Sequence, residues 1–199
     1  LAGGKPKIVK CDEKNGFKLT AKKLQKVISK KTKWLILNSP SNPTGAGYTK
    51  NDIENLAKVL IKNKKVHILS DDIYEHIKYD NFNFYTIAQN SKLKDRTLTM
   101  NGVSKSYAMS GWRIGYAAGP KDIIKALGQI QSPSTSNPSS ISQAAAVEAL
   151  NGSQGFIQKR SKAFKERRDF VVKSLNNING INCLTPNGAF YVFPSCKGL

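Results

Sequence analysis

A lysine, a serine and an arginine lie close together in one glycine-framed stretch of this chain. Lys105 follows Ser104 directly, and Arg113 stands eight residues after the lysine, between Gly102 and Gly115. The amine of a lysine can form a Schiff base with an aldehyde, while a hydroxyl and a guanidinium group can hold a phosphate. Pyridoxal phosphate carries both an aldehyde and a phosphate, so these residue types in this order fit a site for that cofactor.

Two upstream segments carry further polar side chains that suit the same cofactor. The run at 39–45, Ser-Pro-Ser-Asn-Pro-Thr-Gly, contains Asn42, and the run at 70–75, Ser-Asp-Asp-Ile-Tyr-Glu, contains Asp71 and Tyr74. Taken alone, the first run is ordinary turn chemistry, the aspartate is equally a helix cap, and the tyrosine is equally a core aromatic residue. The combination with the lysine segment, in this order, favours the cofactor site over those structural roles.

The three segments together resemble the fold-type I aminotransferases, and most closely their bacterial aspartate aminotransferase branch. The resemblance runs through essentially the whole chain. It implies pyridoxal 5'-phosphate as the cofactor and Lys105 as the catalytic residue, which forms the Schiff base and then moves a proton on the substrate. The cofactor-binding residues that the resemblance implies are Asn42, Asp71, Tyr74, Ser104, Lys105 and Arg113.

The resemblance also gives the other members of this set their roles. Asp71 would hydrogen-bond the pyridine nitrogen and keep it protonated, which makes the ring an electron sink. Tyr74 and Asn42 would donate to the phenolic oxygen from two sides, and Asn42 would also bind the substrate. Arg113 would hold the phosphate as a bidentate fork, with Ser104 adding a hydroxyl, whereas alone Arg113 is equally a structural ion-pair residue.

The chain departs from the family pattern at Gly102, where the family often has a serine that binds the phosphate. Phosphate binding is therefore expected to depend more on Arg113 and on backbone amides. The resemblance further implies an interior segment: Leu1–Gly4 would come shortly after the aromatic residue that stacks on the ring, and Leu199 would precede the arginine that binds the substrate α-carboxylate. The family's activity is accordingly expected of a longer protein, and this chain alone is expected to be inactive.

The composition is strongly basic, with a formal net charge of +19 over 199 residues. A basic chain of this kind can bind nucleic acid through its phosphates. However, only five of the 32 basic residues are arginines, and the lysines are scattered along the polar faces. The densest run, 159–168, contains a single aromatic residue, Phe164, and is read as a solvated helix face. No specific nucleic-acid partner is expected, and a non-catalytic basic fragment that binds polyanions is the alternative.

Other classes of protein receive little support from the residue types. The cysteines, Cys11, Cys183 and Cys196, are odd in number and far apart, so they predict no disulfide framework and suit a reducing cytoplasm. The two histidines, His67 and His76, form no metal-ligand cluster with a cysteine, and no metal site is predicted. No apolar run approaches the roughly 18 residues of a membrane span, and no signal peptide is visible, so we expect a cytoplasmic protein without a membrane partner.

Apolar periodicity predicts the alternating elements that would position the three segments. Short apolar runs predict strands at 34–37, 66–70, 96–101 and 114–118. A capping box of Thr49 and Asp52 predicts the start of a helix. The apolar stripe of that helix comprises Ile53, Leu56, Ala57, Leu60 and Ile61. Further helices are predicted from Pro120 to about Ile130, from Ser139 or Ser140 to Asn151, and from Gln154 to Asn176.

The last of these helices is long and marks a change in organisation. Its predicted apolar side carries Ile157, Phe164, Val171 and Leu175, and a turn, a short strand and a strand at 189–193 are predicted after it. We therefore predict a domain boundary near residue 153. Residues 1–152 would form an incomplete cofactor-binding large domain, and 153–199 the interdomain helix and the start of an α+β small domain.

The strand assignments bring the cofactor residues together independently of the resemblance. Asn42, Asp71 and Lys105 each lie at or just past the carboxyl end of a predicted strand. In an open, mainly parallel α/β sheet with flanking helices these ends share one edge, where such folds bind ligands. The resemblance implies a homodimer that transfers amino groups from aspartate to 2-oxoglutarate; an aromatic amino donor or a prephenate-type acceptor is the alternative.

Overall fold

A four-stranded sheet forms the centre of the computed structural model, which describes residues 3–199. The first two residues of the predicted large domain, Leu1 and Ala2, lie outside the described residues. The strands are β1 (Trp34–Asn38), β2 (His67–Asp71), β3 (Thr97–Gly102) and β4 (Gly115–Ala118). They are hydrogen-bonded in the order β1-β2-β3-β4, with β1, β2 and β3 parallel and β4 antiparallel to β3. The predicted open, mainly parallel α/β sheet is confirmed.

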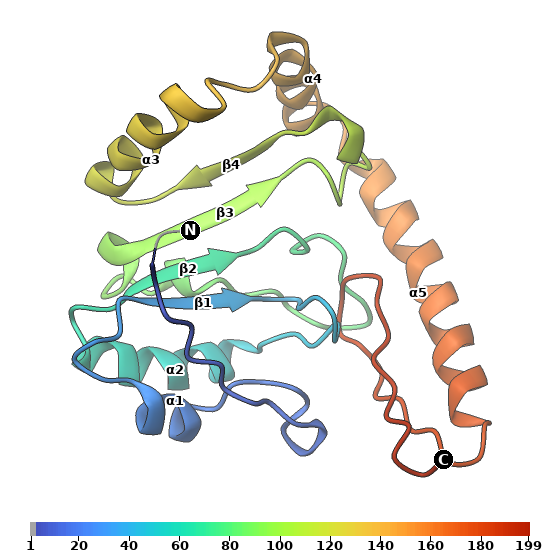
Figure 1. Cartoon of the computed structure of the whole chain (residues 1–199). Coiled ribbons are helices and arrows are strands. Elements are labelled where there is room, and N and C mark those ends of the chain that lie inside the picture. The colour runs from blue at the N-terminus through green and yellow to red at the C-terminus, as the bar shows by residue number, and fades with distance from the viewer. Residues whose placement is uncertain (1–2) are drawn as a thin grey trace.

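Within residues 3–199, five α-helices surround this sheet. They are α1 (Ala21–Val27), α2 (Lys50–Lys62), α3 (Lys121–Ser134), α4 (Ser140–Asn151) and α5 (Gly155–Asn176). Figure 1 shows α1 and α2 together beside β1 and β2, α3 beside β4, and α5 along the side toward which β1, β2 and β3 point. The predicted helices are all present, although α3 continues past Ile130 to Ser134, with Pro133 in its last turn.

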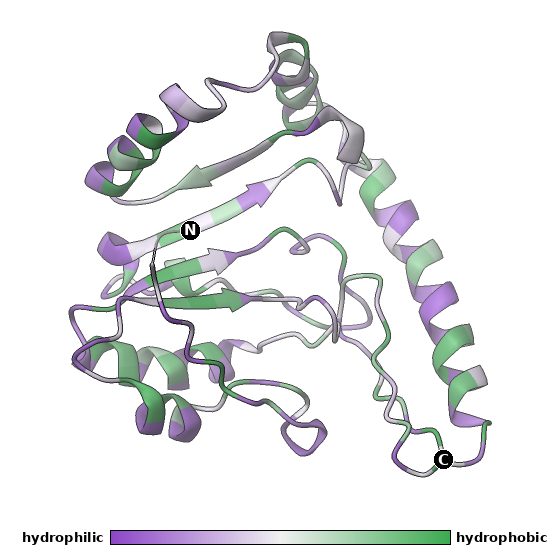
Figure 2. Cartoon of the chain, in the orientation of Figure 1, coloured by the Kyte–Doolittle hydropathy of each residue, from purple (hydrophilic) through white to green (hydrophobic). Residues whose placement is uncertain are grey.

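The start of α2 shows why the sequence folds as predicted here. The Thr49 hydroxyl accepts from the backbone N–H of Asp52, and the Asp52 carboxylate accepts from the backbone N–H of Thr49, which satisfies two free amides. Below this cap, Ile53, Leu56 and Leu60 are at most 1% exposed and pack in one core with the inner residues of β1 and β2. Each such burial contributes about 1.5–3 kcal/mol, so this stripe fixes α2 against the sheet. Figure 2 shows the apolar residues of β1 and α2.

A second, smaller core joins the loop after β2 to the C-terminal segment. Its buried members are Tyr74, Ile77, Tyr79 and Ala189. Backbone hydrogen bonds fix the contact: the Ala189 N–H donates to the Ile77 carbonyl at 2.9 Å, and the Tyr79 N–H donates to the Asn187 carbonyl at 3.0 Å. Residues more than a hundred positions apart are thus held side by side next to the carboxyl edge of the sheet.

The predicted strand at 189–193 is wrong. Over the part of the chain that the structure describes, the C-terminal segment forms only isolated bridges, Lys78 with Gly188 and Asn182 with Ser195. Ala189 has φ +58°, in the left-handed region, which interrupts an extended strand. The segment therefore crosses the loop after β2 as an irregular stretch, and its Ala189 and Tyr191 pack in the small core.

The predicted apolar side of α5 is partly wrong. Ile157 is buried and Phe164 is half-buried, but Val171 is 37% exposed, and the other buried residues of the helix are Arg168 and Val172. The guanidinium group of Arg168 donates to Asp80 at 2.8 Å and to the Pro186 carbonyl at 2.9 Å. These charge-assisted bonds allow the arginine to be buried. The face of α5 that packs inward therefore carries Arg168 and Val172 rather than Val171.

Candidate active site

The carboxyl ends of the three parallel strands meet at one edge, as the sequence predicts. In the strand register, Asn38 at the end of β1 pairs with Asp71 at the end of β2, and Asp71 pairs with Met100 near the end of β3. Asn42 lies four residues beyond β1 and Lys105 three residues beyond β3. All three predicted positions therefore leave the sheet on the same side, the one that α5 passes in Figure 1.

Asn38 links two of these positions, although the motif analysis did not include it. Its side-chain Nδ2 donates to the Asp71 carbonyl at 3.0 Å, and its Oδ1 accepts from the backbone N–H of Asn42 at 2.7 Å. A carboxamide can do both at once, because its NH₂ group donates while its oxygen accepts. An amide side chain at the end of an apolar run, directly before the Pro-rich turn, is the sequence signal that marks it.

Asp71 and its neighbour Asp72 have different environments. The Asp71 carboxylate is half-buried, accepts one bond at 3.3 Å from the backbone N–H of Ile73, and has no ion pair with any basic side chain among residues 3–199. Burial raises its pKa. Asp72 is buried on the core side and accepts from the Ser70 hydroxyl at 2.7 Å, and burial raises its pKa to about 6. Asp71 is therefore the carboxylate available to a ligand, and Asp72 belongs to the core.

Lys105 lies against an aromatic cluster. Its Nζ is 5.9 Å from the ring centre of Tyr74 and 5.7 Å from that of Phe190, within the range of cation–π attraction. Tyr74 is buried, and its hydroxyl lies 2.7 Å from that of Tyr191. Phe190 and Tyr191 come from the C-terminal segment, and no motif in the sequence marks them. Only the fold brings them to the lysine.

The predicted phosphate ligands form a third group on the turn after β3. The Ser110 hydroxyl donates to the Ser104 carbonyl at 2.9 Å, and Arg113 Nη1 donates to the Ser110 carbonyl at 2.8 Å. Arg113 is exposed, so the remaining N–H groups of its fork stay accessible to an anion. Ser110 links the two predicted ligands and was not predicted.

The glycine at the family's serine position has a steric reason in this structure. A Cβ built on Gly102 would lie 3.1 Å from the Gly115 Cα and 3.1 Å from the Ile114 carbonyl oxygen, both backbone atoms. Backbone atoms cannot move aside like the end of a flexible side chain, so β3 and β4 approach closely because position 102 has no side chain. The hydroxyl that the family often supplies here is replaced by close contact between strands.

The three groups are separate units at one edge. Asn42 and Asp71 are joined through Asn38, Tyr74 lies beside Lys105, and Ser104 is joined to Arg113 through Ser110. Within the described residues no hydrogen bond links one group to another. That the three groups bind one common ligand therefore stays a prediction.

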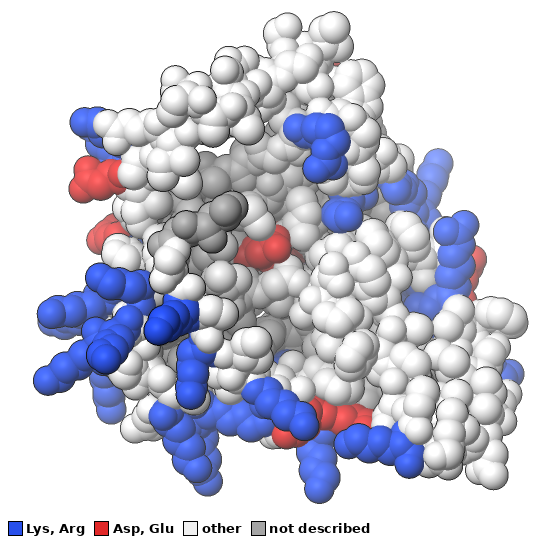
Figure 3. Space-filling model, viewed as in Figure 1, with Lys and Arg blue, Asp and Glu red and all other residues white. Residues whose placement is uncertain are grey.

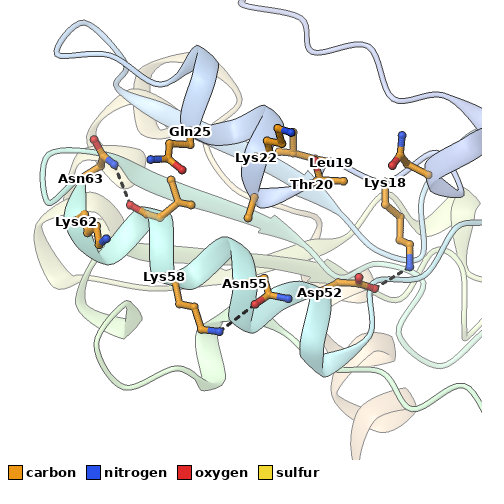
Figure 4. Close-up of a pocket in the computed structure, with 13 residues that line it drawn as sticks. Lys18, Leu19, Thr20, Lys22, Gln25, Asp52, Asn55, Lys58, Lys62 and Asn63 are labelled. Atoms are coloured by element: carbon orange, nitrogen blue, oxygen red, sulfur yellow. Dashed lines mark hydrogen bonds and ion pairs between the residues drawn. The ribbon is translucent and has the colours of Figure 1, made fainter.

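One cavity lies away from this edge, and another lies beside Lys105. A cavity of about 650 Å³ lies between α1 and α2, and its lining includes Lys18, Lys22, Lys58 and Lys62 (Figure 4). Lys18 is paired with Asp52 at 2.7 Å, and the other three lysines are exposed. This open groove of hydrated side chains contains none of the predicted site residues. A second cavity, of about 360 Å³, is lined mainly by apolar residues of α5 and the C-terminal segment, including those beside Lys105.

Two kinds of site are not found. Over residues 3–199, no group of three or more His, Cys, Asp or Glu side chains is arranged to hold a metal ion. Of the helices in that range, none is long and apolar enough to cross a membrane.

Comparison with known proteins gives one consistent family. The family described as aminotransferase class I and II matches residues 1–199. The aspartate aminotransferase of Rhizobium meliloti strain 1021 is 55% identical over 200 residues, covering 100% of this chain and 49% of that protein. A probable aspartate/prephenate aminotransferase of Rhizobium leguminosarum bv. phaseoli is 56% identical and covers 100% of this chain and 50% of that protein. The chain thus spans about half the length of the curated relatives that it matches.

Solved structures agree with these relatives. The crystal structure of the Rhizobium meliloti aspartate aminotransferase superposes with a TM-score of 0.97 at 56% identity, over 98% of this chain and 49% of that one. An aromatic aminotransferase from Pyrococcus horikoshii OT3 superposes with a TM-score of 0.93 at 39% identity, over 97% of this chain and 52% of that one. The sheet and helices described above are therefore those of this structural family.

Proposed function

Because the chain belongs to the class I and II aminotransferases, we propose that its sheet edge binds pyridoxal 5'-phosphate and that the complete protein is a transaminase. The observation that carries the proposal is the half-buried Asp71 carboxylate, which has no cationic partner among residues 3–199 and lies at the same edge as Lys105. A carboxylate of this kind suits a protonated ring nitrogen, which would supply the missing positive charge.

The donor set fits the other parts of the cofactor. The amine of Lys105 would hold the aldehyde carbon, and the exposed fork of Arg113, with the Ser104 hydroxyl, would hold the phosphate. The hydroxyl of Tyr74 and the side-chain amide of Asn42 would donate to the phenolic oxygen. Asn42 is exposed, so its side chain is also accessible to a substrate.

The residues then have distinct chemical tasks. The bound cofactor supplies an electron sink for the negative charge that develops at the substrate α-carbon. Asp71 would hold the proton on the ring nitrogen that makes this sink effective, and the amine of Lys105 would accept and return the proton at the substrate α-carbon.

For the substrates, we propose aspartate as the amino donor and 2-oxoglutarate as the acceptor, giving oxaloacetate and glutamate. The names of the Rhizobium meliloti relatives support aspartate, and those of several others support prephenate as a second acceptor. A prephenate-type acceptor, or an aromatic amino donor, is thus the alternative within the same chemistry. We also propose a cytoplasmic homodimer, and a domain boundary near residue 153, between the end of α4 at Asn151 and the start of α5 at Gly155.

A non-catalytic basic protein that binds polyanions is the alternative from another class. Figure 3 shows lysine and arginine side chains gathered over the side that α1 and α2 occupy, and scattered elsewhere on that face. A scattered lysine surface gives salt-dependent adhesion without sequence preference.

The decisive experiment traps the cofactor on the chain. Pyridoxal phosphate is added, the absorption spectrum is followed, and borohydride reduction is followed by peptide mapping. We expect the label on Lys105, its loss in Lys105→Ala, and its retention in the control Lys58→Ala, which removes an exposed lysine of the groove between α1 and α2. A label mainly on any other lysine would contradict the proposal.

A further inference from the structure

Tyr191, a residue outside the three motifs, contacts the cofactor-binding residue Tyr74 directly. The two hydroxyl oxygens are 2.7 Å apart, although the residues are 117 positions apart in the chain. Their rings meet edge to face, with ring centres 5.8 Å apart and an interplanar angle of 81°. Such a contact combines one hydrogen bond with a favourable aromatic geometry, so it fixes both side chains.

The position of Tyr191 is itself well determined. The preceding Ala189 is completely buried, its N–H donates to the Ile77 carbonyl at 2.9 Å, and its carbonyl accepts from the Tyr79 hydroxyl. Phe190 packs against Phe164 of α5, with ring centres 5.5 Å apart. The C-terminal segment therefore presents Tyr191 to Tyr74 from a fixed backbone.

Two hydroxyl groups at this distance share one hydrogen bond, and its direction matters for the site. A tyrosine hydroxyl has one proton to donate and can also accept. If Tyr74 donated to Tyr191, its proton would be occupied within the protein. If Tyr191 donates to Tyr74, the Tyr74 proton is free for a ligand, and the bond received makes Tyr74 a stronger donor.

We infer that Tyr191 is a positioning residue for cofactor binding: its hydroxyl donates to the Tyr74 oxygen and leaves the Tyr74 proton directed at the phenolic oxygen of pyridoxal phosphate. This inference rests on the proposed function. Burial raises the pKa of Tyr74, so its hydroxyl stays protonated at neutral pH, as a donor must. The C-terminal segment thereby adjusts the electronic state of the cofactor without touching it.

The test is the pH titration of the absorption band of the cofactor held on Lys105. Donors to the phenolic oxygen favour the more negative, deprotonated form, so weakening a donor raises the pKa of this transition. Tyr74→Phe removes the donor and is expected to raise it most. Tyr191→Phe leaves the Tyr74 hydroxyl in place but removes the bond that strengthens it as a donor. The expected loss is only the cooperative fraction of one hydrogen bond, so the pKa of the cofactor transition should rise by roughly 0.1 to 0.7.

Three comparisons make the result specific. Tyr85→Phe removes a tyrosine hydroxyl that donates to Glu54 at 2.9 Å, outside the predicted site, and is expected to leave the titration unchanged. The double variant Tyr74→Phe/Tyr191→Phe is expected to titrate like Tyr74→Phe alone, because the second hydroxyl acts through the first. Thermal unfolding of each variant reports whether the fold is intact.

The outcomes separate this inference from the proposed function. If the unaltered chain binds the cofactor on Lys105 and Tyr191→Phe leaves the pKa unchanged or lowers it, the positioning role is overturned while the proposed function stands. An unchanged titration in Tyr191→Phe together with a changed one in Tyr191→Leu would show that only ring packing matters, and would also overturn it. If the unaltered chain shows no cofactor band, both fall together.

Discussion

Replacing Asn38 tests whether the link between Asn42 and Asp71 matters for cofactor binding. Asn38→Leu keeps a side chain of similar size but removes the donor to the Asp71 carbonyl and the acceptor for the Asn42 N–H. We expect pyridoxal phosphate to bind more weakly, because two of its ligands lose their common anchor, whereas the sheet itself stays intact.

The size of the effect follows from the partners that remain. Two hydrogen bonds contribute about 1 kcal/mol each at most. The Asp71 carbonyl also accepts from the Ser39 N–H at 3.3 Å, and Asn42 is exposed, so its N–H can bond to water instead. The free energy of unfolding is therefore expected to fall by about 1 kcal/mol rather than 2. If cofactor binding loses the same free energy of about 1 kcal/mol, the dissociation constant of the cofactor rises about fivefold.

The assay is a cofactor titration followed by absorbance, with urea unfolding measured in parallel. Asn38→Asp keeps the acceptor for the Asn42 N–H but loses the donor, and it is expected to bind the cofactor more weakly than the parent. Asn55→Leu, which removes an amide that accepts only from Lys58 at 3.0 Å on α2, is the control and is expected to bind normally. Unchanged cofactor affinity in Asn38→Leu, with about 1 kcal/mol lost in unfolding, would show that the link is structural only.

Three further predictions concern the charged residues. Asp71→Ala in the complete protein is expected to lower the rate of transamination far more than cofactor binding, since the ring nitrogen loses its proton; ordinary turnover would refute the role. Burial raises the pKa of Asp72 from 3.8 to about 6, so the folded chain binds more protons than the unfolded chain between those values and stability falls as the pH rises through that range. Asp72→Asn is accordingly expected to be more stable than the parent at pH 7, by up to roughly 3 kcal/mol, and to lose this advantage near pH 4. Urea unfolding at both pH values measures it, and the same stability difference between variant and parent at pH 7 and pH 4 would contradict it. Finally, the +19 charge predicts weak duplex DNA binding that fades as salt approaches about 0.15 M, measured by fluorescence anisotropy, and tight sequence-selective binding at that salt would favour the polyanion-binding alternative.

The parts of the fold that the sequence predicts are those in which a local pattern and the tertiary structure agree. The apolar run at 34–37 forms the predicted strand β1, in which Leu37 is buried while Trp34 and Ile36 are 41% and 69% exposed. The Thr49 and Asp52 cap satisfies the same amides in any context. The common edge of Asn42, Asp71 and Lys105 follows because parallel strands leave no other arrangement. These predictions depend on chain topology and on short-range hydrogen bonds.

The parts that the sequence does not predict depend on contacts between distant segments. Tyr191 lies at the site because Ala189 bonds to the loop after β2, and nothing near residue 191 indicates that partner. The stretch 189–193 is a continuous apolar run like that of a strand, yet it forms no strand among the described residues, and Ala189 and Tyr191 pack in the core around Tyr74 instead. Local periodicity indicates which side chains are apolar but not which surface they will meet.

Arg168 shows how one residue of the basic run connects the long helix to the site. The run 159–168 was interpreted as a solvated face, but the Arg168 side chain is only 6% exposed and lies 4.8 Å from the ring centre of Tyr79. It bonds to Asp80, in the loop after β2, and to the Pro186 carbonyl, just before the segment that carries Tyr191. A buried arginine with satisfied partners costs much to disrupt, because any partner left behind would be buried without its bond. The same side chain therefore holds α5, the loop that contains Tyr74 and the C-terminal segment in one arrangement, which is the arrangement that the hydroxyl pair beside Lys105 requires.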